Sequence, residues 1–426
     1  MTLLLFLGVL IGAILLGLPV AFALLLAAIA LMLQLNLFSA DILAQALING
    51  VDSFPLLAIP FFLVAGEVMS SGGLSQRIVR MAVSMIGHKK GGLGYVAILT
   101  AILLAGLSGS AVADAAALVA ILYPMMQKAG YPGGRSVGLL ASGGIIAPVI
   151  PPSLPLILIG VAGNISIKNL FLGGIVPGLM MGGALMLVWY LLMRNENLET
   201  LERATAAERI AAVKDGVWAL LLPVIIIGGI RFGVFTPTEA AVVAAVYAIF
   251  VSTVIYREMT FQRFLKILVN AGRSTAMVMF LVGCAMVAAW LITVAQLPQQ
   301  LAALLGPLVE NPRLLMAVIM VLVLCVGMVM DLSPTILILV PLLMPVVKLA
   351  NIDPVYFGLM FVINCSIGLI TPPVGTVLNV VCGVGRVPMS SAVKGSWPFI
   401  AAYLVLLALF VAFPSIITVP MKWFIG

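Results

Sequence analysis

Residues able to bind a cation gather at two pairs of interruptions in an otherwise apolar chain. The first pair comprises GLSGSAVADAAAL from Gly106 and GGIIAPVIPPSLP from Gly143, and the second comprises GMVMDLSPTILIL from Gly327 and CSIGLITPPVGTVLN from Cys365. In hydrocarbon, non-helical backbone is tolerated only where protein buries it or where it lines a cavity. The carbonyl oxygens freed there are hard ligands that suit Na⁺, and so are the hydroxyl groups of Ser108, Ser110, Ser333, Thr335, Thr371 and Thr376.

The two pairs of interruptions are related by one constant offset, 221 residues. It carries Gly106, Pro124, Pro151, Pro152 and Pro177 onto Gly327, Pro345, Pro372, Pro373 and Pro398. A register shared without a gap over about seventy residues indicates an internal duplication. Helices interrupted at matching positions of two repeats mark the ion and substrate sites of a transporter.

The composition is that of an all-α polytopic membrane protein. Hydrophobic residues make up 64% of the 426 residues, charged residues only 8%, and the mean hydropathy is +1.29. A soluble domain needs a more polar surface. We interpret the net charge of +7 as basic loops that face the cytoplasm and anionic lipid, and not as a nucleic-acid surface. The apolar run 3–33 predicts one retained transmembrane helix.

Few residues are available for catalysis or for a transition metal. The four cysteines form no Cys-x-x-Cys pair, and the single histidine, His88, lies in a basic loop. A disulfide framework, a zinc site and a multi-histidine site are therefore disfavoured. One enzyme reading stays open, because GLSG from Gly106 matches the Gly-x-Ser-Gly motif of rhomboid-type intramembrane proteases. Ser108 would then need a histidine base within hydrogen-bond reach.

Charges beside the interrupted segments predict their topology. The loops that flank 93–127 hold four basic residues and no acid, whereas 314–347 is flanked by Glu310 and Arg313 on one side and by Lys348 and Asp353 on the other. The positive-inside rule then places both ends of the first segment in the cytoplasm and both ends of the second outside. We therefore expect two re-entrant hairpins that enter the membrane from opposite sides.

This topology divides the chain into three parts. Residues 1–193 are expected to form the first inverted repeat, with hairpin 1 at about 93–127 and a broken helix at about 136–165. A cytoplasmic connector and a linking helix follow at 194–235, and the Glu199/Arg203 spacing in the connector predicts a solvated helix. The second inverted repeat occupies 236–426, with hairpin 2 at about 314–347 and a broken helix at about 355–385.

The second repeat opens with a helix-capping motif. Thr236-Pro237-Thr238-Glu239 predicts a capping box with proline at the first helical position. A functional role for Glu239 is the alternative, because Leu18-Pro19-Val20, the partner of this motif in the first repeat, lacks the cap residues.

At several separate sites the chain resembles the large membrane subunit of tripartite ATP-independent periplasmic (TRAP) transporters. The matching strings are GGLGYVAILTAILLAGLSGSAVADAAAL from Gly91, GYPGGRSVGLLASGGIIAPVIPPSLP from Gly130, GVFTPTEAAVVAAVYA from Gly233 and GLITPPVGTVLN from Gly368. Long strings are far more specific than one short motif, and together they extend over almost all of the sequence.

The resemblance implies a nine-helix, two-hairpin elevator fold in a bacterial inner membrane. It implies no enzymatic activity and no cofactor, but Na⁺-coupled import of an organic acid that a soluble periplasmic binding protein delivers. It also implies a separate small membrane subunit of about four helices, in a complex without nucleic acid. Family substrates include C4-dicarboxylates, 2-oxo and sugar acids, and sialic acids, and the sequence looks nearest to the sialic acid branch. A stand-alone sodium–dicarboxylate symporter of similar architecture is the alternative.

We expect at least two sodium sites at the mirrored interruptions, because broken helices free carbonyl oxygens without burying a formal negative charge. The first places Ser108 and Ser110, at the tip of hairpin 1, against the break of the following helix. The second places Gly327, at the tip of hairpin 2, against the other break. The residues expected at the breaks are Ala147, Ile150 and Pro152, with Ser153 as an alternative to Pro152, and Gly368, Thr371 and Val374.

The substrate carboxylate is expected between the two tips, near half-helix N-termini that attract anions. The polar residues expected nearby are Ser153, Asn164, Thr376 and Asn379. Asp114 and Asp331 are the acids of the two hairpins. An ionisable residue at such depth suggests function, and the alternatives for each are a helix N-cap or a partner for a loop lysine.

Overall fold

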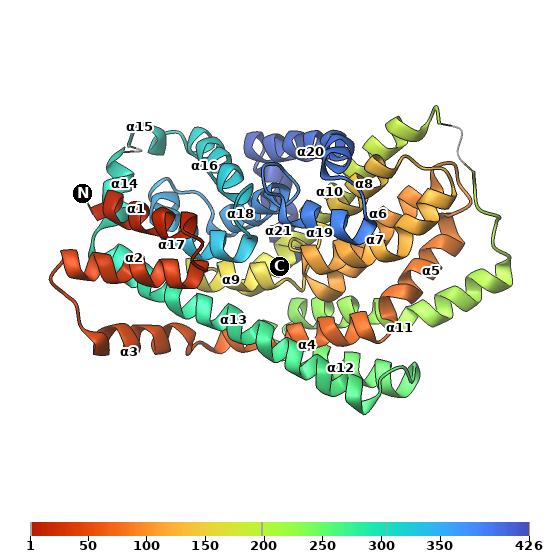
Figure 1. The fold of residues 1–426 in the computed structure, drawn as a ribbon, viewed down its shortest axis with the longest axis horizontal. Helices are drawn as coiled ribbons and strands as arrows, with labels where there is room; N and C mark the ends of the chain where they lie inside the picture. Colours follow the sequence, from red (N-terminus) through yellow and green to blue (C-terminus); the bar gives the residue numbers. More distant parts are fainter. Residues whose placement is uncertain (1, 197–198, 305, 426) are drawn as a thin grey trace.

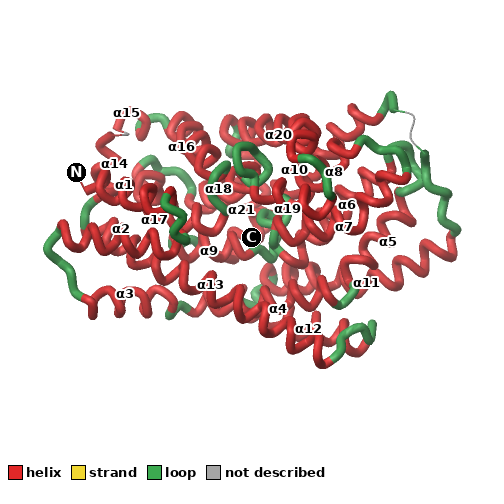
Figure 2. Tube along the Cα trace, viewed as in Figure 1, coloured by secondary structure: helices red, strands yellow, loops and turns green. Residues whose placement is uncertain are grey.

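The computed structural model describes residues 2–196, 199–304 and 306–425, and these residues form helices joined by loops, without a strand. Figure 2 shows this all-helical trace. The expected all-α fold is confirmed. Seven helices in the described part are long and apolar enough to cross a membrane, and many large apolar side chains point outward on them, as a lipid-facing surface requires.

The first half of the chain contains eleven helical elements. They are α1 (Thr2–Leu15), α2 (Val20–Gln34), α3 (Ala40–Val51), η1 (Phe54–Leu57), α4 (Ala58–Ser71), α5 (Leu74–Ile86), α6 (Gly92–Ser108), α7 (Ala111–Lys128), α8 (Gly133–Gly144), α9 (Leu154–Gly163) and α10 (Ile167–Met193).

The remaining elements follow the connector. They are α11 (Ala206–Arg231), α12 (Pro237–Phe250), the π-helical turn η2 (Val251–Ile255), α13 (Phe261–Val294), α14 (Leu297–Leu304), α15 (Gly306–Val309), α16 (Pro312–Gly327), α17 (Leu332–Leu349), α18 (Pro354–Gly368), α19 (Thr376–Gly385), α20 (Met389–Ala412) and α21 (Ser415–Ile425).

The starts of corresponding helices repeat the offset found in the sequence. Helix α3 begins at residue 40 and α13 at 261, α7 at 111 and α17 at 332, and α8 at 133 and α18 at 354, so each start recurs 221 residues later. Both predicted broken helices are interrupted where expected. Residues 145–153 separate α8 from α9, and residues 369–375 separate α18 from α19, with Pro151-Pro152 and Pro372-Pro373 inside these breaks.

Two predicted helices differ from the structure. The run 3–33 is not one helix, since α1 and α2 pack side by side as a helical hairpin (Figure 1). Gly17 has a φ of +86° and Pro19 precedes α2, and both residues stop a continuing helix. In the connector, residues 199–205 are not helical, so the Glu199/Arg203 helix was predicted wrongly. Helix α11 begins at Ala206 behind a capping box instead.

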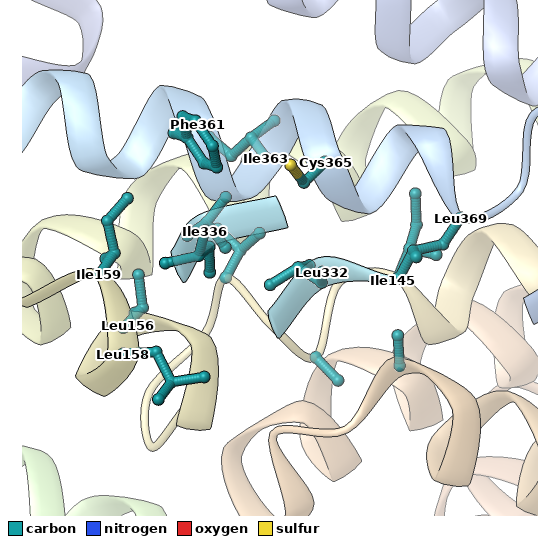
Figure 3. Close-up of a cluster of buried hydrophobic side chains, with 14 of the residues drawn as sticks. Ile145, Leu156, Leu158, Ile159, Leu332, Ile336, Phe361, Ile363, Cys365 and Leu369 are labelled. Atoms are coloured by element: carbon teal, nitrogen blue, oxygen red, sulfur yellow. The ribbon is translucent and has the colours of Figure 1, made fainter. Parts of the chain in front are cut away.

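The two repeats interlock through their broken helices. Helix α9 of the first repeat packs against α17 of the second, and α19 of the second packs against α7 of the first. Figure 1 shows α17 and α9 left of centre and α19 and α7 right of centre, above the long diagonal helix α13. In Figure 3, Ile336 of α17 lies between Leu156 of α9 and Cys365 of α18, and Leu332 lies between Ile336 and Ile145. Buried apolar contacts therefore hold the two breaks beside each other.

A charged cluster around Arg77 ties the outer helices together. The guanidinium group of Arg77 on α5 forms ion pairs with Glu258 at 2.7 Å and with Asp215 at 3.7 Å, and it stacks on the ring of Tyr256 at 3.8 Å. These partners lie on α11 and on the loop after η2. The cluster therefore joins the first repeat to the connector and to the second repeat.

Candidate functional site

The tip of hairpin 1 touches the first helix break through backbone atoms. Gly109, in the turn between α6 and α7, has a φ of +62°, and a Cβ atom there would lie 2.6 Å from the carbonyl oxygen of Pro152. A Cβ on Gly106 would lie 3.8 Å from the carbonyl oxygen of Pro151. Glycine is required at position 109 by both its conformation and its close approach. The structure therefore brings Ser108 and Ser110 to the break that contains Pro152.

Side-chain hydrogen bonds organise this first tip. The hydroxyl group of Ser108 donates to Asp114 Oδ1, and it accepts from the backbone N–H of Ser110 at 3.2 Å. The Ser110 hydroxyl caps α7 by accepting from the N–H of Ala113 at 3.4 Å. Asp114 is 5% exposed, and its Oδ2 atom has no hydrogen-bond partner in the described residues. Asp114 is thus neither an N-cap nor a lysine partner.

The first break is closed and buried. Ser153 is 1% exposed; its hydroxyl donates to the carbonyl of Pro148 and accepts from the N–H of Leu156 at 3.4 Å, which caps α9. Ala147 and Ile150 lie in the irregular segment before it, and their side chains are buried. Their apolar side chains have no ligand atom, so these two residues could contribute only a main-chain carbonyl oxygen to a cation site. Because the Ser153 hydroxyl already donates its one hydrogen, it has no donor left for a carboxylate and retains only acceptor capacity.

The second tip meets its break through glycine backbones. A Cβ on Gly368 would lie 2.5 Å from the carbonyl carbon and 2.7 Å from the carbonyl oxygen of Gly327. The N–H of Val374 donates to the carbonyl of Met328 at 3.2 Å, and the Thr371 hydroxyl donates to the carbonyl of Ile367 at 2.7 Å. The structure therefore groups Gly327, Gly368, Thr371 and Val374, the four residues that the sequence predicts for the second sodium site.

Polar groups at the second break are less engaged than those at the first. Helix α19 begins after Gly375, which has no side chain to cap it, and the buried Thr376 hydroxyl has no hydrogen-bond partner in the described residues. Asn379 is exposed and donates to the carbonyl of Val374 at 2.8 Å. Asp331 stands at the N-cap position of α17, exposed and without a side-chain cap bond.

Four helix N-termini meet where the tips and breaks meet. A Cβ on Gly109, just before α7, would lie 3.0 Å from the Cα atom of Ser153, just before α9, and the Val374–Met328 bond joins the segments that precede α19 and α17. The pairs α9/α17 and α7/α19 run alongside each other and are in contact. The first turns of four half-helices therefore surround one centre, where unpaired N–H groups and helix dipoles favour an anion.

Asn164 lies apart from this centre. It ends α9 in a left-handed conformation, about 15 Å along the helix from Ser153 at 1.5 Å per residue. It lines a different cavity, of about 410 Å³, together with Lys168, Ser53 and Thr236. A Cβ on the adjacent Gly163 would lie 2.9 Å from Met344, well along α17 from its start. Asn164 therefore does not join the other residues predicted for the substrate.

One neighbour of the first tip was not predicted. Helix α4 approaches hairpin 1 so closely that a Cβ on Gly66 would lie 3.6 Å from the Cα atom of Ser108. The next residue, Glu67, lines a cavity of about 220 Å³ with Ser108 and Asp114. In the sequence, Glu67 stands out as a single acid within the apolar run 54–69, which could have marked it as a functional residue. Only the fold shows that it lies beside the tip of hairpin 1.

The structure does not place a histidine base beside Ser108, as a serine protease would require. His88 lies in the loop before α6, whereas Ser108 ends that helix, about 25 Å away at 1.5 Å per residue. Partial desolvation, followed by the charges of Arg209, Arg203 and Lys89, lowers the pKa of His88. The Ser108 hydroxyl donates to a carboxylate instead. Ser108 therefore lacks the histidine base that the enzyme reading requires.

Two interlocked repeats with broken helices and a buried polar centre define a polytopic membrane transport protein. A family model described as the DctM component of tripartite ATP-independent periplasmic transporters matches residues 7–416, and the chain belongs to this family. Members of this kind are permeases and not enzymes, which agrees with the geometry at Ser108.

Individual relatives support the family assignment. The chain is 57% identical to the 2,3-diketo-L-gulonate TRAP transporter large permease protein of Escherichia coli K12, over 99% of the chain and 100% of that protein. It is 40% identical to the sialic acid TRAP transporter large permease protein of Vibrio cholerae, over 97% of each. Its fold resembles that of the Alcanivorax borkumensis YdaH transporter, with a TM-score of 0.68 at 16% identity, over 92% of the chain and 91% of that structure.

Proposed function

We propose that this large permease imports an organic acid together with Na⁺, by an elevator movement of the two hairpins and broken helices against the outer helices. The observation that carries the proposal is the meeting of four half-helix N-termini at two helix breaks. Breaks expose backbone carbonyls, which bind Na⁺, and helix N-termini, which bind an anion. One centre therefore offers sites for both the coupling ions and the substrate.

The coupling ions are assigned to the two contacts between tip and break. In the first, Ser108 and Ser110 face the segment that contains Ala147, Ile150 and Pro152. In the second, the Thr371 hydroxyl oxygen retains acceptor capacity while it donates to Ile367, and it lies beside the carbonyls of a tight glycine contact. Side-chain changes at the apolar members act through shape, since those members offer main-chain oxygen only.

The substrate carboxylate is assigned to the starts of α19 and α17. Neither helix has a side-chain cap, whereas Ser110 and Ser153 already cap α7 and α9. The buried Thr376 hydroxyl without a protein partner adds a donor at this end. Uncapped N–H groups and an unpaired hydroxyl are what an incoming carboxylate can satisfy. Asn379 lies one turn further along α19.

A sugar acid is the substrate class that we propose. The E. coli relative named for 2,3-diketo-L-gulonate is more similar to this chain, at 57% identity, than the V. cholerae relative named for sialic acid, at 40%. We further propose that a soluble periplasmic binding protein delivers the acid and that a separate small membrane subunit completes the complex in the bacterial inner membrane. The family description as tripartite supports these two partners.

Reconstitution tests the proposal directly. The complete transporter in proteoliposomes should accumulate 2,3-diketo-L-gulonate when Na⁺ is outside and the binding protein is present. Replacing Na⁺ with choline should abolish accumulation, and N-acetylneuraminate and succinate should be poor competitors. Ser108→Ala and Thr371→Val should each raise the Na⁺ concentration for half-maximal uptake by about tenfold, the scale expected for one lost ligand to an ion.

Two results would contradict the proposal. Equal uptake in choline with a proton gradient would remove the sodium coupling. Uptake by this chain alone, without the binding protein or the small subunit, would favour the stand-alone carrier. If succinate proved the better substrate, the sugar-acid assignment would be wrong. If N-acetylneuraminate did, the sugar-acid class would stand but the choice of 2,3-diketo-L-gulonate would be wrong. The transport mechanism would stand in both cases.

A further inference from the structure

The cavity between α4 and hairpin 1 collects negative charge at the boundary between the outer helices and the tip. It measures about 220 Å³ and is lined by Glu67 of α4, by Asp114 of α7, and by the hydroxyl groups of Ser70, Ser75, Ser108 and Ser274. These residues come from five helices or helix ends. Two carboxylates and several hydroxyl oxygens therefore share one small space.

No positive side chain balances these carboxylates. Neither lysine nor arginine is found among the described residues that line the cavity, and neither Glu67 nor Asp114 forms an ion pair within the described ranges. Asp114 is 5% exposed and receives one hydrogen bond, from Ser108, which leaves Oδ2 unpaired. A buried carboxylate oxygen without a partner carries a large desolvation cost. Among the described lining residues, no side chain offsets the charge of the two acids when they are ionised.

We propose that this cavity is a cation site, distinct from the two sites at the tip–break contacts, in which Glu67 and Asp114 hold one hard monovalent ion together with serine hydroxyl oxygens. The proposal rests on the proposed sodium coupling, so Na⁺ is the ion that we assign to it. The carboxyl and hydroxyl groups of the lining are oxygen donors, which suit a hard ion, and a cavity of this size holds an ion with water.

The location of the site gives the ion a second role. Gly66 packs against Ser108, so the Glu67 half of the site belongs to α4 and the Asp114 half to hairpin 1. Movement of hairpin 1 past α4 would separate the two halves. The ion therefore stabilises the conformation seen here, and its release accompanies the movement. Asp114 also positions Ser108, since it accepts the hydrogen bond of that hydroxyl.

Counting bound Na⁺ tests the proposal without any assumption about substrate. Equilibrium binding of ²²Na⁺ to the purified complex should give one ion fewer per chain for Glu67→Gln than for the natural protein. Glu199→Gln, an exposed acid of the connector, is the matched control and should keep the full count. In proteoliposomes, Glu67→Gln should make the dependence of uptake on Na⁺ less steep, while Thr371→Val, which lies outside this cavity, reports on the second tip–break site.

The outcomes separate this proposal from the proposed function. If the natural protein binds no Na⁺, sodium coupling itself fails. If the natural protein and Glu67→Gln bind equal numbers of ions with half-saturation within twofold, the Glu67 site is wrong and the tip–break sites stand. Should Glu67→Gln fail to fold, Ser274→Ala on α13, another residue of the lining, replaces it. That variant should weaken binding of one ion severalfold, and unchanged binding would overturn the proposal.

Discussion

The two helix breaks occupy matching positions in the two repeats, yet they are built differently. Around the first break, Ser110 and Ser153 cap the helices that follow, and the acid of the hairpin, Asp114, is buried and hydrogen-bonded. Around the second break, Gly375 precedes α19, and the acid of that hairpin, Asp331, which the offset of 221 residues pairs with Ser110, is exposed and makes no cap bond.

This difference indicates that the two breaks of the duplicated fold bind different ligands. Where side chains satisfy the helix starts, the backbone has fewer free donors, and the remaining oxygens suit a cation. Where the helix starts are bare, their N–H groups are available to an anion. Under the proposed function, we therefore expect the first break to bind a cation only, and the second to receive the substrate carboxylate beside its own cation site.

Both breaks depend on close backbone contact, so adding a methyl group at the second break should have the largest effect. Gly368→Ala would place a Cβ 2.5 to 2.8 Å from three backbone atoms of Gly327. Backbone atoms cannot rotate away, and we expect destabilisation by about 3 kcal/mol or more with loss of transport. Thermal unfolding of the purified protein measures the first effect and proteoliposome uptake the second.

Gly383→Ala is the control for this change, because a Cβ there meets nothing within 4 Å although the residue also lies near the second break, on α19. It should leave stability and uptake close to those of the natural protein. Equal behaviour of the two alanine variants would show that the tip of hairpin 2 and its break are not in contact.

Substituting the acids of the two hairpins tests whether the two breaks have different roles, and the expected effect is the next largest. Asp114→Asn removes the charge that accepts from Ser108 and faces Glu67, and we expect uptake at limiting Na⁺ to fall roughly ten- to a hundredfold, as for a lost charge-assisted hydrogen bond. Asp331→Asn changes an exposed side chain without a cap bond, and a change of no more than about threefold is expected. A larger effect at Asp331 than at Asp114 would reverse the assignment of the two breaks.

Removing one hydroxyl at each break should separate folding from binding. Ser153→Ala loses a buried cap and should cost about 1 kcal/mol of stability, while the KM for substrate changes little. Thr376→Val removes a hydroxyl without a protein partner, so stability should be nearly unchanged while the KM rises about tenfold. Melting curves and uptake kinetics on the same preparations distinguish the effect on stability from the effect on substrate binding. A loss of stability for Thr376→Val with an unchanged KM would contradict the substrate assignment.

The positions of the breaks could be predicted from the sequence, because proline and glycine act locally and the duplication supplies an independent check. Gly109 and Pro152 lie within the predicted tip and break, and they are in contact. The turn between α1 and α2 was missed because hydropathy averages over a single glycine and proline. Charge spacing predicted a connector helix at 199–203, but one i, i+4 charge pair is too weak to stabilise so short a helix, and the segment is not helical.

Residue partners were harder to predict than helix breaks. Asn164 is eleven residues from Ser153 in sequence, but the straight helix between them carries it to the other end of α9. Glu67 and Asp114 share a cavity only because Gly66 lets α4 approach Ser108. The unequal capping of the two breaks also depended on atomic contacts, since Asp331 and Ser110 both have side chains able to cap.

A substitution at the start of α12 should have the smallest effect of all. It tests whether the transport site is confined to the two breaks. Thr236 accepts from the N–H of Glu239, and the Glu239 carboxylate accepts from the N–H of Thr236 at 2.8 Å, so the predicted capping box forms. Glu239→Gln retains an acceptor oxygen, and the melting temperature should fall by no more than a few degrees. Uptake and its Na⁺ dependence should match those of the natural protein. A raised KM in a normally folded Glu239→Gln variant would mean that an acid remote from both tips takes part in transport, and the two breaks would then not contain the whole site.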